Sequence, residues 1–350
     1  MRGSVALGVV YTLLVGCFFD PSGGTGGDSE DTGSASGTTG SPSTSSSTSL
    51  STSASEPSTT GDPDTGSQSS TETSETSPTS SEASDTGDPP LEGCPEQLPD
   101  GWILCEGFED IDDPDAHFSL WSSPEPGDRF AIDSMQAHDG DASLVAQHDV
   151  EWFSGAAWIR FGQGPMQTPH APRARFEEVW VRMHLLLEDG WDVGGLGDLI
   201  EVNSLGTNWA HTMSASIDAP SGGDSLRARA RTCVSSGVVQ CDGQQDWQDL
   251  QELGNDPGDT ALFDGSASGQ WHCIVMHVRL NEPGTSDGVL EISLDGAPEA
   301  TLDDLDFVGT IEGAGLNALH LSAYRENGPS QAVRRYIDDI VVADVPLDCG

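Results

Sequence analysis

One face of the segment WHCIVMHVRLNEPGTSDG, residues 271–288, is apolar and the other is largely polar. This alternation, with a period of two residues, predicts a β-strand that is buried on one side. The apolar face consists of Ile274, Met276, Val278 and Leu280. The opposite face carries His277 and Arg279, which either line a binding surface or are ordinary solvated side chains.

Short alternating segments of this kind recur between residues 94 and 350, separated by turns rich in Gly, Pro, Asn and Asp. Strands at this spacing predict an all-β fold, with two antiparallel sheets packed as a jelly-roll sandwich. We expect Val179, Val181 and Met183 of the segment EEVWVRMHLLL to lie in the same core. A short helix is expected only in the segment DWQDLQEL, residues 246–253.

The amino-terminal region has the layout of an exported lipoprotein. Residues 1–16 join one arginine to a short apolar run, which predicts a signal peptide and is too short for a membrane-spanning helix. The sequence LVGC resembles a bacterial lipobox, so we expect lipidation of Cys17 and attachment to the cell envelope, at the outer membrane or cell surface. A plain signal peptide with an incidental cysteine is the alternative. Residues 17–93 are mostly Ser, Thr, Gly, Pro and acids, which predicts a disordered linker before a folded domain at 94–350.

The charge of the chain limits its partners. There are 58 acidic residues against 13 basic ones, all of them arginine, and the net charge is −45. This balance argues against nucleic acid and against electrostatic binding to anionic lipid, which leaves the lipid anchor as the expected membrane contact. Six cysteines remain after Cys17, an even number that suits an oxidising compartment. The segment CVSSGVVQC predicts a hairpin that pairs Cys233 with Cys241.

Two segments carry a family resemblance. The pattern W-x-C followed by VRLN-x-PG-x-x-DGVLEISLDG, together with the terminal RYIDDIVVA, resembles the concanavalin A-like jelly rolls. Within that group it is most similar to polysaccharide lyases that act on uronate-containing glycans such as alginate and glucuronan. The resemblance implies an anionic polysaccharide as partner. Arg279 stands where that family commonly has lysine, and arginine can neutralise a carboxylate but cannot serve as a base.

Side chains suited to such chemistry fall opposite the core face of four predicted strands, and we expect them to share one binding face. β-Elimination needs a cation to neutralise the uronate carboxylate, a base to take the proton, and an acid for the departing oxygen. The candidate cations are Arg182, Arg229 and Arg279, and Trp180 is an aromatic candidate for contact with the substrate. Candidates for the base are His184, His277 and His320, and the candidate acid is Tyr324. The alternative is that these residues are separate and structurally satisfied.

Three other interpretations stay open. The same side chains without a placed base and acid would form a non-catalytic carbohydrate-binding or adhesion module, while a hydrolase is disfavoured because no E-x-D-x-x-E signature is present.

The segments CEGFED and YIDDIVV resemble parts of carbohydrate-binding jelly rolls that hold a structural Ca²⁺. That resemblance implies Glu109 and Asp339 as calcium ligands, since carboxylate oxygens suit this ion.

Overall fold

The computed structural model describes residues 93–111, 119–123, 130–148, 154–164, 170–191, 198–206, 209–220, 223–243, 249–323 and 332–350. They belong to one unit of the chain, Ser81–Gly350. Cys17, Tyr324 and the expected signal peptide and linker lie outside the described residues, apart from the last linker position. Within the described part, no helix has the length and hydropathy needed to cross a membrane.

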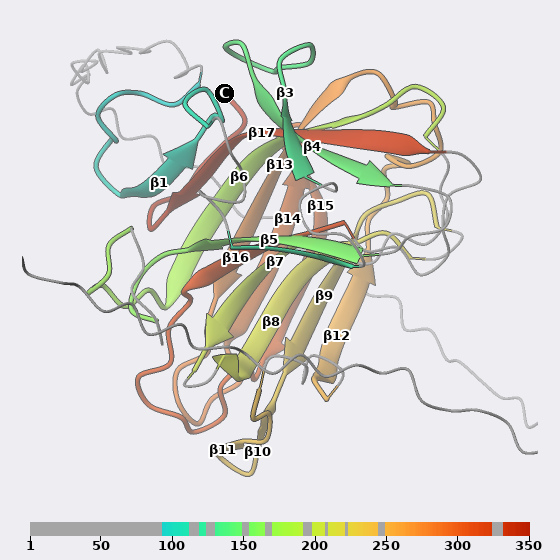
Figure 1. Ribbon diagram of the computed structural model, residues 1–350. Coiled ribbons are helices and arrows are strands. Elements are labelled where there is room, and N and C mark those ends of the chain that lie inside the picture. The colour runs from blue at the N-terminus through green and yellow to red at the C-terminus, as the bar shows by residue number, and fades with distance from the viewer. Residues whose placement is uncertain are drawn as a thin grey trace, which may run out of the picture. The chain divides into compact units, whose positions relative to one another are not determined.

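The larger of two main sheets has eight strands in the order β15-β14-β13-β6-β17-β4-β3, with β1 also paired to β17 (Figure 1). All of its pairings are antiparallel. Its strands are β1 (Trp102–Glu106), β3 (Phe130–Asp133), β4 (Ser143–His148), β6 (Glu178–Leu187), β13 (Trp271–Arg279), β14 (Gly288–Leu294), β15 (Ala297–Leu305) and β17 (Val333–Ala343).

The second main sheet has seven strands in the order β12-β9-β8-β7-β16-β5-β2, and Figure 1 shows β7, β8, β9 and β12 side by side in it. Its pairings are also antiparallel. Its strands are β2 (Ser119–Ser123), β5 (Ser154–Arg160), β7 (Asp198–Leu205), β8 (His211–Asp218), β9 (Arg227–Thr232), β12 (Gln251–Pro257) and β16 (Ala318–Ser322).

The inner faces of the two sheets form one hydrophobic core, so the expected antiparallel sandwich is confirmed. Every core residue named from the alternation is buried in it: Val179, Val181, Met183, Ile274, Met276, Val278 and Leu280. Side chains at alternate positions of each strand therefore point out of the sandwich, on one of two opposite outer faces.

Two local expectations have opposite outcomes. The disulfide Cys233–Cys241 is present, across a hairpin of β10 (Val234–Ser235) and β11 (Val238–Val239). Its two-residue turn has positive φ angles at both positions, as a type I′ turn requires, and the second is a glycine. The helix expected at residues 246–253 is not formed in the described part of that segment, because residues 251–253 belong to β12, which pairs with β9; residues 246–248 lie outside the described residues. The other disulfides are Cys94–Cys105 and Cys273–Cys349.

Candidate functional site

A row of polar side chains crosses the outer face of the seven-stranded sheet. Strand register places His320 of β16 opposite Trp158 of β5 on one side and Glu201 of β7 on the other. Glu201 is opposite Ser216 of β8, which is in turn opposite Arg229 of β9. The neighbouring positions along these strands enter the core: Ile159, Val202, Ile217, Ala228, Leu319 and Leu321. We call the row, with Arg231 and Ser214 next to it, the polar face.

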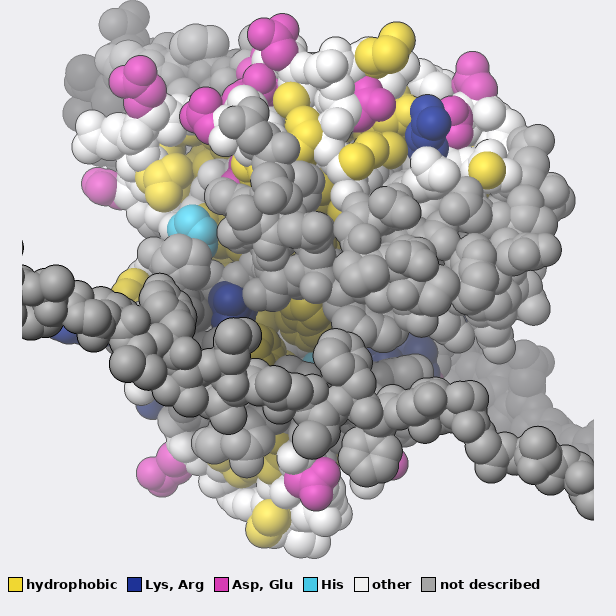
Figure 2. Space-filling view, in the orientation of Figure 1, with side chains coloured by type: hydrophobic (Ala, Val, Ile, Leu, Met, Phe, Trp, Pro, Cys, Tyr) yellow, Lys and Arg dark blue, Asp and Glu magenta, His cyan; other side chains and the backbone are white. Residues whose placement is uncertain are grey.

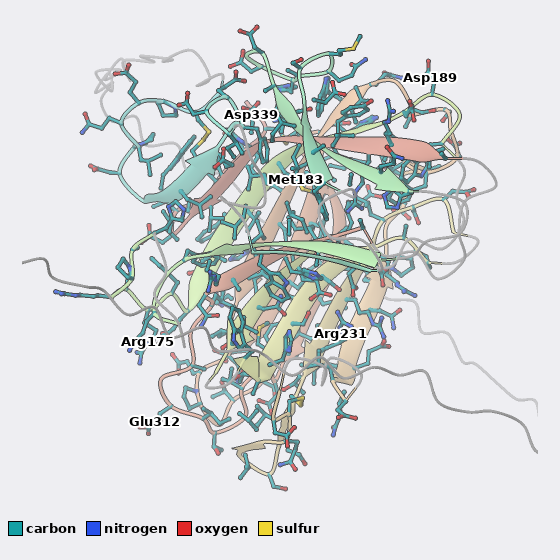
Figure 3. All side chains as sticks on the ribbon, viewed as in Figure 1. Arg175, Met183, Asp189, Arg231, Glu312 and Asp339 are labelled. Atoms are coloured by element: carbon teal, nitrogen blue, oxygen red, sulfur yellow. A yellow bond between two sulfur atoms is a disulfide. The ribbon has the colours of Figure 1, made fainter. Side chains whose placement is uncertain are left out.

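Arg231 is at the centre of an ion-pair network on the polar face (Figure 3). Its Nη2 donates to Asp198 Oδ2 at 3.1 Å, to Glu201 Oε1 at 2.9 Å and to Ser214 Oγ at 3.3 Å. The Arg231 and Glu201 side chains are only 7% and 9% exposed. Buried charges need partners of opposite charge, and here the carboxylates of Asp198 and Glu201 share the one guanidinium of Arg231.

The two carboxylates of this network have pKa values shifted in opposite directions. Burial, with the negative charge of Glu201, raises the pKa of Asp198 well above its ordinary value. Burial alone would also raise the pKa of Glu201, but the Arg231 guanidinium, with Asp198 and His320, holds it well below its ordinary value. Glu201 is therefore the carboxylate that keeps its charge, and Asp198 is the one that takes up a proton first.

His320 reaches the same carboxylate from the opposite side. Its Nδ1 lies 3.5 Å from Glu201 Oε2, and its ring stacks on Trp158 with 4.3 Å between centroids and 22° between planes. Glu201 therefore has Arg231 at one oxygen and His320 near the other. A carboxylate beside one ring nitrogen favours the tautomer that leaves the other nitrogen able to accept a proton. This arrangement can hold and move a proton next to a cation.

Several buried polar atoms of the polar face have no hydrogen-bond partner among the described residues. They are Asn203 Oδ1, Ser216 Oγ, Arg231 Nε and His320 Nδ1. Buried polar atoms are nearly always paired, by protein, water or a bound molecule. These atoms could pair with a bound molecule, which makes the polar face a candidate ligand site.

The other arginines of β9 are paired as well. Arg227 makes a bidentate pair with Asp218, through Nε at 2.7 Å and Nη2 at 2.6 Å. Arg229 Nε donates to Glu252 Oε2 at 3.0 Å, and both of these side chains are partly exposed, at 31% and 43%. The cations of this strand are thus balanced by carboxylates before any ligand binds.

The predicted site residues are divided between the two sheets. Arg229 and His320 lie on the polar face, whereas Trp180, Arg182, His184, His277 and Arg279 lie on the eight-stranded sheet. The hydrophobic core separates these two outer faces. The single shared binding face is therefore not formed, because alternation indicates which side chains point away from the core but not to which sheet a strand belongs.

The residues on the eight-stranded sheet have structural partners. His277 lies between two carboxylates, with Nδ1 2.7 Å from Glu291 Oε2 and Nε2 2.8 Å from Glu178 Oε1. Trp180 stacks on the His277 ring at 4.3 Å with 2° between planes. Arg182 Nη1 donates to the Asp348 carbonyl at 3.3 Å, and its guanidinium lies 5.5 Å from the centre of the Trp102 ring.

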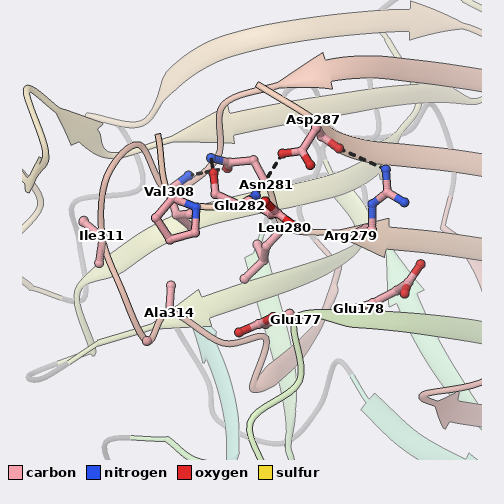
Figure 4. A pocket seen from close by; sticks show the side chains of 12 residues that line it. Glu177, Glu178, Arg279, Leu280, Asn281, Glu282, Asp287, Val308, Ile311 and Ala314 are labelled. Carbon is pink, nitrogen blue, oxygen red and sulfur yellow. Dashed lines mark hydrogen bonds between the residues drawn. The ribbon is translucent and has the colours of Figure 1, made fainter. Parts of the chain in front are cut away.

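A pocket of about 300 Å³ lies beside Arg279 (Figure 4). Arg279 Nη2 donates to the Asp287 carbonyl at 3.0 Å. Four acidic side chains also line the pocket: Glu177, Glu178, Glu282 and Asp287. An anionic glycan would be repelled here, so this pocket does not fit the expected ligand. Among the coloured side chains of Figure 2, acidic ones stand near the upper and lower ends of the view and basic ones are seen in few places.

Both expected calcium ligands have protein partners in the structure. Both Glu109 oxygens accept backbone N–H bonds, Oε1 from Asp141 and Ala142 and Oε2 from Asp141, at 3.0–3.1 Å. Asp339 Oδ2 instead faces two imidazoles, at 2.7 Å from His138 Nδ1 and 3.5 Å from His184 Nδ1. Calcium prefers oxygen ligands, so this donor set does not fit it.

Sequence reasoning missed Asp198, Glu201 and Trp158. Glu201 stands between the apolar residues Ile200 and Val202 of β7. The signal available in the sequence was this acidic residue between two apolar ones. Its pairing with Arg231, 30 residues away, depends on strand order and could not be derived from the alternation.

No family model matches this chain, and no curated protein matches it by sequence. Among solved structures it is similar to an endo-β-1,4-glucuronan lyase of Trichoderma reesei, at 13% identity and a TM-score of 0.43, over 70% of this chain and 91% of that one. It is also similar to alginate lyase vAL-1 from a Chlorella virus, at 11% identity and a TM-score of 0.44, over 61% of this chain and 88% of that one. A third similar structure is a PL-14 alginate lyase of Aplysia kurodai, at 12% identity and a TM-score of 0.44, over 64% of this chain and 88% of that one. At these identities the similarity is no evidence of a shared activity.

Proposed function

We propose that the polar face binds a polysaccharide laid across the strands and cleaves uronate-containing chains by β-elimination. The observation that carries this proposal is the convergence of Arg231 and His320 on the carboxylate of Glu201. The row from Trp158 to Arg229 extends this centre across five adjacent strands. An aromatic ring, an imidazole, hydroxyls and guanidinium groups in one line suit a chain of sugar rings.

Each residue at the centre has a role in the proposed reaction. Arg231 stabilises the negative charge that develops on the uronate carboxylate, because its guanidinium is the cation at the centre of the polar face. His320, oriented by Glu201, takes the proton from the carbon that bears this carboxylate. The electron pair forms the new carbon–carbon double bond, and the glycosidic oxygen leaves with its bonding electrons and takes up the proton that His320 now carries, which returns the imidazole to its neutral form. Trp158 packs against the base and holds its ring in place.

A second function is favoured by the charge balance of the polar face. The three arginines of β9, Arg227, Arg229 and Arg231, are all paired with carboxylates. A face without excess positive charge attracts a polyanion weakly, so a module that binds glycans without cleaving them is the alternative.

The experiment is incubation of the purified chain with glucuronan, alginate and a neutral β-glucan, following the absorbance of the unsaturated product. A lyase releases product from a uronate polymer, and His320→Gln abolishes this release. The matched control is His277→Gln, which changes a histidine on the opposite outer face and keeps the activity. Glycan binding without product supports the binding module, while no binding to any of the three polymers contradicts both functions.

We also propose that the chain is held at the cell envelope by a lipid on Cys17, with residues 17–93 as the connection. Several acyl chains give stable attachment, whereas one gives only reversible binding. This placement would bring the polar face close to envelope or extracellular polysaccharides.

A further inference from the structure

A second cluster of functional side chains lies on the eight-stranded sheet, away from the polar face. It consists of His138, from the loop after β3, His184 of β6 and Asp339 of β17. One ligand atom from each lies within 4.8 Å of the other two. Figure 3 labels Asp339 in this cluster and Arg231 on the other sheet. We propose that these three residues bind a transition-metal dication of the zinc class.

An irregularity in β17 and the Asp338 carboxylate hold His138 and Asp339 in place. The register of β17 shifts between Asp338 and Val341, and Asp339 has a φ of 48°, which is rare for a residue other than glycine. The Asp338 carboxylate accepts the N–H of His138 at 2.8 Å and the N–H of Asp339 at 2.8 Å. The bulge thus directs Asp339 toward the loop that carries His138, and strained positions of this kind often occur at functional sites.

The donor geometry leaves one buried ligand atom unsatisfied. His138 and His184 stack with 3.5 Å between ring centroids and 8° between planes. His138 Nδ1 hydrogen-bonds to Asp339 Oδ2 at 2.7 Å. His184 Nδ1 lies 3.5 Å from the same oxygen and has no hydrogen-bond partner among the described residues, although the His184 side chain is only 10% exposed. A cation bound by both rings and the carboxylate would satisfy all three groups.

The chemistry of the three donors selects the metal. Two imidazole nitrogens and one carboxylate oxygen suit Zn²⁺, Ni²⁺ or Cu²⁺, whereas calcium and magnesium prefer oxygen alone. Metal–ligand bonds of about 2.0–2.1 Å at tetrahedral angles place neighbouring ligand atoms about 3.3 Å apart. The separations of 2.7 Å and 3.5 Å lie on either side of this value, and the two stacked rings must also tilt apart so that both imidazole nitrogens point at one ion. The His138 side chain is 32% exposed, so an ion can enter from solvent and keep water as a further ligand.

Binding would join three segments that are far apart in the sequence. His138 and Asp339 are 201 residues apart, and β6 and β17 are neighbouring strands of one sheet. An ion that binds only the folded chain stabilises it in proportion to its occupancy. The site is therefore a structural clamp on the loop after β3, and it does not depend on glycan cleavage at the polar face.

The test uses the untagged full chain, treated with a chelator and then titrated with Zn²⁺ or Ca²⁺ by calorimetry and thermal unfolding. We expect one Zn²⁺ per chain, a higher Tm with Zn²⁺, and no comparable change with Ca²⁺. His138→Gln removes a partly exposed ligand and should weaken Zn²⁺ binding by more than about 100-fold, because losing a partner that only orients a metal ligand already costs about 10–100-fold.

The matched control is His277→Gln, since His277 also lies on the eight-stranded sheet between carboxylates. This variant should bind Zn²⁺ like the parent. The proposal is overturned if the parent binds no Zn²⁺, if His138→Gln binds it with unchanged affinity, or if Ca²⁺ gives the same rise in Tm.

Discussion

Replacing Arg231 by methionine should destabilise the protein strongly, because it leaves the buried carboxylate of Glu201 and the partly buried carboxylate of Asp198 without their shared cation. The Arg231 side chain is 7% exposed, and its Nη2 lies 3.1 Å from Asp198 and 2.9 Å from Glu201. Methionine keeps much of the apolar volume, so the loss is mainly that of the charge. Removing one partner of a buried ion pair costs about 3–5 kcal/mol. At about 2–4 °C per kcal/mol for a domain of this size, Tm should fall by roughly 6–20 °C.

The assay is urea unfolding at pH 7 and pH 4, with Arg229→Met as the matched variant on the same strand. Arg229 is 31% exposed and its partner Glu252 is 43% exposed, so this pair contributes only about 0–1 kcal/mol. The cost of Arg231→Met should shrink at pH 4, where the unpaired carboxyls take up protons. Equal losses for the two variants at pH 7 would refute the buried network around Arg231.

Three further predictions concern other parts of the chain. Burial raises the pKa of Asp198, so the contribution of this residue to stability is present at low pH and is lost as the pH rises through the raised value. The unfolding free energy of Asp198→Asn should therefore fall less than that of the parent between about pH 4 and 8. Parallel curves of unfolding free energy against pH would contradict this. Gly288→Ala should cost about 1–3 kcal/mol in urea unfolding, because a Cβ there would lie 2.8 Å from the Leu305 carbonyl oxygen, whereas a Cβ at Gly243 meets no described atom within 4 Å and Gly243→Ala should be neutral. Cys17→Ala should move the protein from the membrane fraction to the soluble fraction or block its processing, and unchanged fractionation would remove the lipid anchor.

Local sequence patterns were sufficient for the strands and for part of the core. The alternation in residues 271–280 and 178–187 gives the buried faces of β13 and β6 correctly, because each face is set by neighbouring residues alone. The hairpin that joins Cys233 to Cys241 was also predictable, since both cysteines and the turn lie within nine residues. The strand at residues 251–253, where a helix was expected, has a long-range cause, because β12 forms through its pairing with β9.

The candidate sites depend on strand order, which the alternation does not contain. His184 and His320 both point away from the core, yet β6 and β16 belong to different sheets, so one lies near Asp339 and the other near Glu201. His138 gave no signal of its own, because it stands on a loop and meets its partner 201 residues later. Long-range pairing therefore decides which histidine meets which carboxylate.

The polar face of the seven-stranded sheet is the central claim, and chemical-shift mapping tests where a glycan binds. Backbone amide and tryptophan indole signals of the isotopically labelled chain would be followed during titration with a short uronate oligosaccharide. The largest changes are expected at Trp158, Glu201, Ser216 and Arg229, along the row that crosses the sheet. Changes confined to Trp180 and its neighbours on the eight-stranded sheet would contradict the account.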